Sequence, residues 1–230
     1  MNLEKIWQKY QVEKLNYAAI APFLEEKGVN INYTKGAKII EKGDFPSYVY
    51  FIVKGIVQGQ KSYENGNEYL YFETDNTSGN LGLLEVLGRK RRYSATVTCL
   101  TDVEVIKVES GLVYQTIMNN TKLLQKVVLL FGEDLYCSSK QDGIYYYYNG
   151  INRLRMYLKS YFEKNSLDLE QRVIVSKTYG MIASHVGVST KTISRNMQKL
   201  KENQEVTVLG KKIVLTKKHY LRLKYQLDGI

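Results

Sequence analysis

The pattern of apolar residues changes near Val108, and this change constrains the fold more than any other feature. Before it, short segments rich in Val, Ile, Tyr, Thr and Phe are separated by Gly, Asn and Asp, which is typical of antiparallel strands and tight turns. After it, residues 112–148 contain no proline and carry apolar residues at helical spacing. The chain is therefore predicted to join a strand-rich N-terminal domain to a long helix.

The N-terminal segments predict a β-barrel or sandwich, because many short strands separated by turns are typical of those folds. Asn65-Gly66 predicts a type I′ hairpin turn, which needs the positive φ that Asn and Gly adopt cheaply. The predicted strands are Ala37–Ile40, Val49–Val53, Ile56–Ser62, Glu68–Glu73, Ala95–Cys99 and Val103–Val108.

The long helical segment, interrupted by Gly132 and Gly143, carries an apolar face that is wider than one helix contact needs. The face comprises Leu123, Val127, Leu130 and Asp134, flanked by Leu124, Val128, Phe131 and Leu135. One part can cover the barrel while the other, near Cys137, pairs with a second subunit. Periodicity alone equally allows a helix buried within one chain. Asn149 is the predicted N-cap of a second helix, which runs to about Lys164.

The positive charge is confined to the last third of the chain. Residues 1–149 hold 17 Lys and Arg against 17 Asp and Glu, whereas residues 150–230 hold 16 against 6. The formal net charge of +10 therefore belongs entirely to residues 150–230. Such a segment either binds a polyanion or is a soluble basic surface, and charge alone does not separate the two.

Residues 178–201 predict two short helices around a sharp turn at Gly187, with Thr178 and Tyr179 at the start of the first helix. Ser189 is the predicted N-cap of the second helix. Its apolar side is Ile193, Met197 and Leu200, so the opposite side presents Thr190, Lys191, Ser194, Arg195 and Gln198. A polar, positive helix face of this kind fits the major groove of DNA.

A short hairpin with a basic tip follows the two helices. Residues 206–208 and 213–215 are apolar and flank Leu209-Gly210-Lys211-Lys212. This pattern predicts a wing, in which Lys211 and Lys212 contact DNA phosphates. The alternative is that both lysines are merely solvated turn residues.

Several kinds of site are not expected. No apolar run approaches the roughly 20 residues of a membrane span, and the N-terminus lacks a secretory signal, so a cytoplasmic protein with no membrane partner is predicted. Cys99 and Cys137 fit no zinc spacing and are too few for an iron–sulfur cluster. With only His185 and His219 available, no haem-binding or other metal-binding pattern is found. The sequence contains no recognisable set of nucleophile, base and orienting group, so an enzyme is not expected and no catalytic residue is predicted.

With these residues placed, the chain resembles the Crp/Fnr superfamily over nearly its full length. The stretches that carry the resemblance are residues 50–57, 79–85, 93–97 and 191–195. The resemblance implies an α+β fold, with N-terminal helices and a jelly-roll, cupin-like antiparallel β-barrel sensor in residues 1–110. A helical linker and dimerisation helix would occupy residues 111–148, and a winged helix-turn-helix residues 149–230. It also implies a homodimeric transcriptional regulator that binds pseudo-palindromic double-stranded DNA and contacts RNA polymerase.

The predicted effector pocket departs from that of the cyclic-nucleotide-binding relatives. Asn80 stands where they carry Glu and Tyr93 where they carry Arg, so cyclic AMP is not the expected effector. The other pocket candidates are Gly79, Leu81, Arg92, Ser94, Ser138 and Ser139. Two alternatives remain open: the pocket binds an unidentified small-molecule effector, or the protein has no effector. No cofactor is assigned.

The recognition helix also departs from the relatives. Lys191 replaces the Glu usual in many of them, which predicts a different operator, because Lys donates to guanine or thymine acceptors. The competing function is a ligand-binding adaptor that acts through protein contacts without DNA.

Overall fold

The computed structural model describes residues 2–9, 14–24, 27–62, 68–77, 79–166, 172–210 and 212–228. Contacts divide the chain into two units, Met1–Ser138 and Ser139–Ile230. We describe each unit by itself. No described helix is long and apolar enough to cross a membrane.

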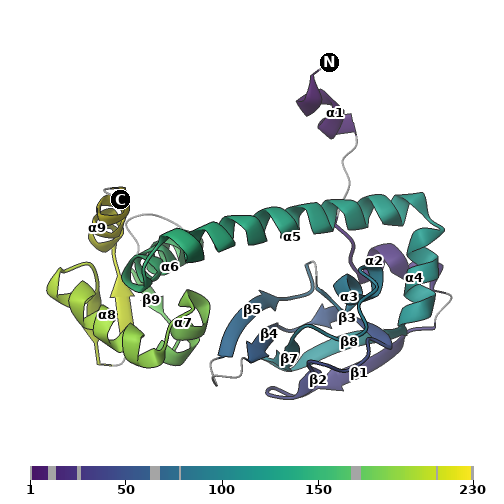
Figure 1. The fold of residues 1–230 in the computed structure, drawn as a ribbon, viewed down its shortest axis with the longest axis horizontal. Helices are drawn as coiled ribbons and strands as arrows, with labels where there is room; N and C mark the ends of the chain where they lie inside the picture. The colour runs from purple at the N-terminus through teal and green to yellow at the C-terminus, as the bar shows by residue number, and fades with distance from the viewer. Residues whose placement is uncertain are drawn as a thin grey trace. The chain divides into compact units, whose positions relative to one another are not determined.

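Unit 1 contains two antiparallel four-stranded sheets (Figure 1). One sheet has the order β1-β8-β3-β6 and the other β2-β7-β4-β5. The strands are β1 (Val29–Tyr33), β2 (Lys38–Ile40), β3 (Tyr48–Lys54), β4 (Val57–Ser62), β5 (Glu68–Thr74), β6 (Asn80–Leu81), β7 (Thr96–Cys99) and β8 (Val103–Glu109). In the part of the chain that the structure describes, the two sheets pair separately, and closure into a barrel is not seen.

The alternation of side chains along β3 explains how unit 1 forms two hydrophobic layers. Tyr50 and Ile52 point into the core between the two sheets, where they meet residues of β2, β4, β7 and β8. Val49 and Phe51 point to the opposite face and pack against helices. Both faces of the sheet are therefore buried at β3, which agrees with the nearly continuous run of apolar residues in this strand.

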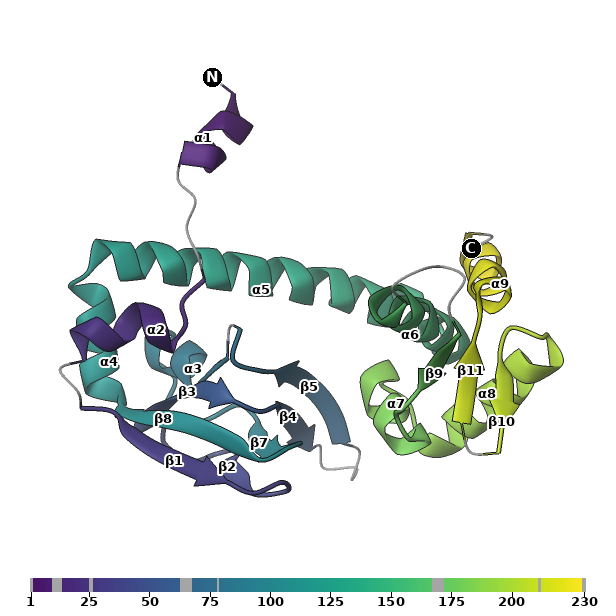
Figure 2. The same cartoon turned by 180° about the vertical axis from the view of Figure 1, so that it is seen from behind.

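Helices of unit 1 cover the β3 and β8 face (Figure 2). They are α2 (Tyr17–Ile20), the 3₁₀ turn η1 (Ala21–Phe23), α3 (Leu83–Leu87), α4 (Ser110–Met118) and the first part of α5 (Thr121–Tyr147). A further helix, α1 (Leu3–Lys9), precedes them in the chain.

The single long helix predicted over residues 112–148 is two helices in the structure, α4 and α5. The break lies at Asn120, whose side chain accepts hydrogen bonds from the backbone N–H of Lys122 and Leu123 at 3.0 and 3.1 Å. Gly132 and Gly143 do not interrupt α5, which corrects that expectation.

Unit 2 is a helical domain with a three-stranded antiparallel sheet of order β10-β11-β9. Its elements after α5 are α6 (Gly150–Asn165), β9 (Val173–Val175), α7 (Tyr179–Val186), α8 (Thr190–Glu202), β10 (Thr207–Leu209), β11 (Lys212–Leu215) and α9 (Lys217–Asp228). One apolar core joins them, with Leu154, Leu158 and Phe162 of α6 at its centre.

Most predicted elements are confirmed, and their bounds differ by only one or two residues. Asn149 caps α6 as predicted, because its side chain accepts a hydrogen bond from the Asn152 backbone N–H at 3.1 Å. The predicted Asn65-Gly66 turn lies outside the described residues. Strands β1, β6 and β9 and the helices α3 and α9 were not predicted.

Candidate nucleic-acid interface and effector pocket

Helices α7 and α8 form a helix-turn-helix whose turn is fixed by three local features. Thr178 caps α7 by accepting the Met181 backbone N–H at 3.3 Å. Gly187 ends α7 with φ 69°, a left-handed conformation that favours glycine. Ser189 caps α8 by accepting the Thr192 backbone N–H at 3.1 Å. Tyr179 is half-buried against the core, and this burial raises the pKa of its hydroxyl.

Helix α8 has one buried side and one exposed polar side, as its sequence predicts. Ile193, Met197 and Leu200 are at most 2% exposed and hold the helix on the core. The five residues predicted to face DNA are all exposed: Thr190, Lys191, Ser194, Arg195 and Gln198. Gln198 donates to the Glu202 carboxylate at 2.9 Å, whereas Lys191 and Arg195 form no ion pair within the described part of the chain. Two unneutralised cations therefore stand on this face.

The predicted wing is present as the β10–β11 hairpin. Gly210 at its tip has φ 60°. Lys212 is exposed beside the tip, while Lys211 lies outside the described residues. The unpredicted strand β9 pairs with β11 and anchors the hairpin to the core.

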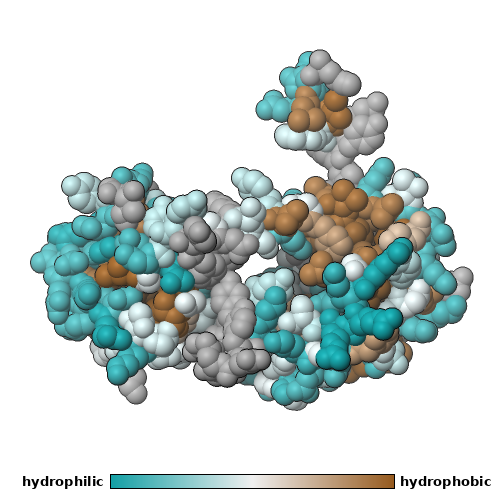
Figure 3. Space-filling view, viewed as in Figure 1, coloured by the Kyte–Doolittle hydropathy of each residue, from teal (hydrophilic) through white to brown (hydrophobic). Residues whose placement is uncertain are grey.

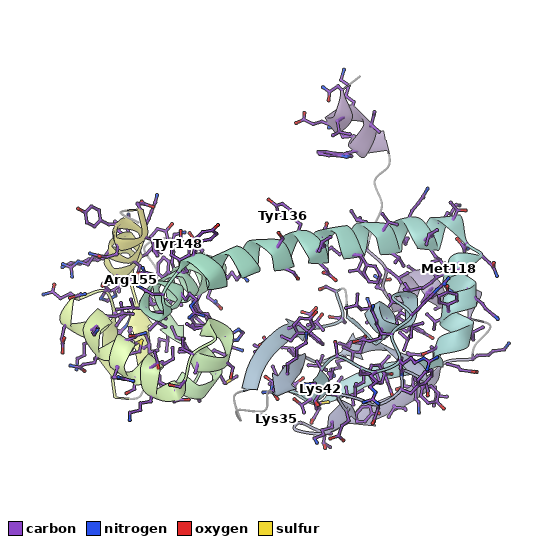
Figure 4. The ribbon with its side chains drawn as sticks, viewed as in Figure 1. Lys35, Lys42, Met118, Tyr136, Tyr148 and Arg155 are labelled. Carbon is purple, nitrogen blue, oxygen red and sulfur yellow. The ribbon has the colours of Figure 1, made fainter. Side chains whose placement is uncertain are left out.

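Two arginines of α6 contact the segments on either side of α8, and sequence reasoning missed both. Arg153 donates to the backbone carbonyls of Val186 and Gly187 at 3.1 and 3.4 Å, at the turn before α8. Arg155 forms a bidentate ion pair with Glu205, which follows α8, and donates to Asn152 at 2.7 Å. Arg155 is labelled in Figure 4. Helix α6 is thus bonded to both flanks of the exposed polar helix.

Tyr93 lies in the interior of unit 1. It stands at the position where the cyclic-nucleotide-binding relatives are expected to carry a ligand-binding arginine. The side chain is 7% exposed and belongs to the core between the sheets. Its hydroxyl donates to the backbone carbonyl of Tyr48 at 2.6 Å. Burial raises the pKa of Tyr93, so the group stays neutral. Tyr93 therefore fills this position with an uncharged ring.

The hydrogen-bond donors of Ser94 are already used within the chain. The Glu85 carboxylate, which is 8% exposed, accepts the Ser94 backbone N–H at 3.0 Å and its hydroxyl at 2.7 Å. Both donors would otherwise be available to an anion. Glu85 lies in the stretch 79–85 that resembles the family, but its role was not predicted, because the pairing with Ser94 depends on how α3 lies against the segment before β7.

The remaining pocket candidates are divided between the interior and the surface. Leu81 is buried and Asn80 half-buried in β6, next to β3. A side chain at Gly79 would clash with the Asp75 backbone oxygen, which explains glycine there. Arg92 is exposed, so it does not take the position of the missing arginine. Ser138 and Ser139 are exposed on α5.

The apolar face of α5 is divided more sharply than its sequence indicated. Leu123, Val127 and Leu130 are at most 4% exposed because they pack on the core of unit 1, so they are unavailable to a second subunit. These three residues are therefore the part of the predicted apolar face that covers unit 1. Asp134 and Cys137 are exposed. The exposed aliphatic residues of α5 among those described are Leu124, Val128 and Leu135, at 36%, 66% and 71%.

The cysteines and histidines are placed as ordinary side chains. Cys99 is a buried free thiol, whereas Cys137 is an exposed one. The His185 ring lies tilted against the Tyr157 ring, with the two ring centroids 5.3 Å apart and the planes at 33°. Within the described ranges, no group of three or more potential ligands could hold a metal ion.

Comparisons with known proteins agree with this architecture. Residues 30–120 match the family model of the cyclic nucleotide-binding domain. No curated protein sequence matches the chain. The structure is similar to the c-di-GMP-responsive global regulator CLP of Xanthomonas campestris, with a TM-score of 0.77 and 14% identity over 87% of this chain and 99% of that one.

Two further solved structures have the same fold. One, from Eubacterium rectale, is assigned to the Crp/Fnr family and has a TM-score of 0.71 and 15% identity, covering 92% of this chain and 95% of its own. The other is a Crp/Fnr-family transcriptional regulator from Thermus thermophilus, with a TM-score of 0.68 and 18% identity over 87% and 98%. Residues 30–120 are therefore similar to cyclic nucleotide-binding domains, and the chain has the fold of the Crp/Fnr transcriptional regulators.

Proposed function

We propose that this protein is a homodimeric transcriptional regulator that binds a pseudo-palindromic DNA operator through α8. The observation that carries the proposal is the exposed face of α8, where Lys191 and Arg195 stand without carboxylate partners among the described residues. Arg and Lys donate to guanine in the major groove, and nearby hydroxyls reach bases or phosphates. Lys212 on the hairpin adds a phosphate contact.

The exposed apolar residues of α5 support a dimer through this helix. Leu124, Val128 and Leu135, with half-buried Phe131, are spaced by four, three and four residues. This spacing is that of a two-helix coiled-coil seam. Figure 3 shows apolar residues gathered over the N-terminal half of α5. Two copies paired in this way would present two α8 helices related by a two-fold axis, which matches a pseudo-palindrome.

Cyclic AMP does not control this regulator in our proposal. Its phosphate would meet the buried ring of Tyr93 and the Glu85 carboxylate on the Ser94 donors. A carboxylate in that place repels a phosphate instead of binding it. A different small-molecule effector, or none, is consistent with the same contacts.

The proposed activity is binding rather than catalysis, in the cytoplasm, with RNA polymerase as the protein partner. The adaptor alternative has no observation that favours it, since the basic face of α8 and the hairpin are both formed.

The test is a selection of genomic DNA fragments by the purified full-length protein at a stated salt concentration, with and without cyclic nucleotides and cell extract. We expect enrichment of a two-fold-symmetric sequence that differs from the usual cyclic-AMP-regulator consensus. Arg195→Ala should abolish this enrichment while the dimer persists. Lys224→Ala is the matched control, because it removes one exposed cation from α9 instead of α8.

The outcomes separate the alternatives. Enrichment without additives supports a regulator that is competent by itself, whereas enrichment only with extract indicates an effector. A folded dimer that enriches no sequence under any condition would refute DNA binding and favour the adaptor.

A further inference from the structure

The Glu85 carboxylate is a buried anion that is held by groups suited to binding anions. Glu85 is 8% exposed, and its Oε1 accepts the Ser94 backbone N–H at 3.0 Å and the Ser94 hydroxyl at 2.7 Å. A backbone N–H and a hydroxyl that converge on one oxygen can hold a carboxylate or a phosphate oxygen equally well. Here the oxygen belongs to the chain itself, so the position is already occupied by an anion.

The charge of this carboxylate also acts on Lys61 of β4. Lys61 is half-buried, and its Nζ lies 3.6 Å from the centroid of the Tyr71 ring. Burial lowers the pKa of Lys61, whereas the nearby Glu85 carboxylate raises it and so favours the ammonium form. The surroundings of the Glu85 carboxylate therefore supply a positive charge as well as two hydrogen-bond donors. Both suit a negative charge at this position.

Hydrogen bonds connect Glu85 to the helices that follow unit 1's sheets in the chain. The Glu85 backbone oxygen accepts the Lys90 N–H at 2.8 Å, so one residue closes both ends of the loop that leads to Ser94. Arg89, in the same loop, donates to the Tyr114 hydroxyl of α4 at 3.0 Å. Helix α3 contacts α4, and α4 leads into α5 (Figure 2). An anion at this position is therefore bonded, through a short series of contacts, to the helix that precedes α5.

We propose that Glu85 takes the place of an anionic effector, so that unit 1 holds its anion-bound arrangement, and the protein binds its operator, without any added ligand. A ligand shifts a conformational equilibrium only through the contacts that differ between the two states, and a side chain that makes the same contacts has the same effect. A carboxylate attached to the chain is present at a high effective concentration, so a free anion competes with it poorly. The inference rests on the regulator of the proposed function and chooses, of the two alternatives left open there, the protein that needs no effector.

Acetate provides a direct test of the anion site. Glu85→Ala removes Cγ and the carboxylate, and acetate has the same atoms. Thermal unfolding of the full-length variant is followed against acetate concentration, with the ionic strength held constant by a bulky sulfonate buffer. We expect a saturable rise in the unfolding temperature of Glu85→Ala, because acetate binds the folded state. The neutral isostere acetamide should give no such rise, and the native protein should not respond to acetate.

The operator gives the regulatory readout. A duplex selected with the native protein is titrated with native protein and with Glu85→Ala, each with and without acetate at the same ionic strength. The native protein should bind equally in both conditions. Glu85→Ala should bind several-fold more weakly without acetate and should regain the native affinity with it.

Two control variants distinguish this result from a general loss of stability. Glu85→Gln keeps the volume of the side chain and leaves no room for acetate, so acetate should not change its operator affinity. Glu41→Ala removes an exposed carboxylate of the same unit, which pairs with Lys38 on the surface. It should bind the operator as the native protein does, with or without acetate.

The outcomes separate this inference from the proposed function. Glu85→Ala that binds the operator as tightly as the native protein without acetate, or more tightly, would overturn the inference, as would a weakened affinity that acetate does not restore. The native protein gives a readout that depends on no variant, since a several-fold rise in its operator affinity with phosphate or cell extract would also overturn the inference. In each of these cases the DNA-binding regulator stands. A native protein that binds no DNA would refute the proposed function and the regulatory role of Glu85 together, whereas the response of Glu85→Ala to acetate would still decide whether Glu85 fills an anion site.

Discussion

The Glu205 carboxylate receives two hydrogen bonds from the Arg155 guanidinium, each at 2.7 Å, and the two residues are 1% and 8% exposed. Asn203 donates a third hydrogen bond to this carboxylate at 3.1 Å. The pair joins α6 to the segment between α8 and the wing. The same contacts therefore hold the C-terminal end of α8 to α6, the helix that follows α5 in the chain.

Glu205→Ala should therefore destabilise the protein strongly. Removing one partner of a buried ion pair leaves the other charge uncompensated and costs about 3–5 kcal/mol. Glu163→Ala removes a partially exposed pair with Lys159 and should cost less than about 1 kcal/mol. Urea unfolding of both variants checks this. Equal losses would show that Arg155 is accommodated without Glu205.

Tyr93→Phe tests the hydrogen bond that ties Tyr93 to β3. The substitution keeps the ring but removes the donor to the Tyr48 carbonyl, which leaves a buried acceptor unsatisfied at a cost of about 1–3 kcal/mol. Thermal unfolding gives the loss. The same assay on the native protein should show no shift with cyclic AMP, and a concentration-dependent shift would contradict the proposal that cyclic AMP does not bind beside Tyr93 and Glu85.

Lys191 and Lys212 should affect DNA binding in different ways. Lys191→Ala removes a base-edge donor, so it should cost about 1–3 kcal/mol and relax the preference at one position of each half-site. Lys212→Ala removes a phosphate contact, which should weaken all sequences similarly and lower the slope of log affinity against log salt by about 1. Titrations of the selected operator and a scrambled duplex at several salt concentrations distinguish the two. Identical behaviour would mean that Lys191 contacts the backbone.

Leu135→Asp should dissociate the dimer. The substitution places a charge in the predicted seam of α5, where burying it is costly, so the dimer dissociation constant should rise at least about tenfold, or about 1.4 kcal/mol. Tyr136→Asp is the control, since Tyr136 is 74% exposed and projects from α5 one position beyond the seam (Figure 4). Sedimentation measures both. An unchanged constant for Leu135→Asp would place the dimer contact elsewhere.

The elements that depend on local patterns were predictable from sequence. The helix-turn-helix follows from Gly187, the Ser189 cap and the spacing of Ile193, Met197 and Leu200. The strands follow from β-branched and aromatic residues between turn residues. In contrast, the single long helix was wrong because Asn120 forms a local cap, which its sequence context did not make obvious.

Features that depend on distant segments were not predictable. Arg155 and Glu205 are 50 positions apart in sequence, and Glu85 meets Ser94 only because α3 folds back on the following segment. The apolar width of α5 indicated two contacts, but only the packed core shows that Leu123 and Val127 belong to unit 1. Helix α9 was missed because its lysines and tyrosines give weak apolar periodicity, although Leu223 is fully buried.

His219 should make the wing sensitive to acid. Its Nδ1 accepts the Thr216 backbone N–H at 3.1 Å, so this nitrogen carries no proton, and its Nε2 lies 3.2 Å from the Thr207 hydroxyl of β10. Burial, and then the positive Arg222 and Lys218, lower the pKa of His219 below its ordinary value of 6.5. The unfolded chain thus binds more protons than the folded one between these two pKa values. The His219 contribution to the free energy of unfolding is present above pH 6.5 and is lost as pH falls through the folded-state pKa.

Urea unfolding between pH 8 and pH 5 should therefore show a decline in stability that His219→Gln reduces, because Gln does not titrate. Carboxylates also titrate toward the acid end, so the difference between native protein and variant isolates the His219 contribution. His185→Gln, which removes the only other histidine, is the matched control and should keep the native decline. If His219→Gln and the native protein lose stability in parallel, protonation of His219 does not weaken its contact with Thr207 of the wing.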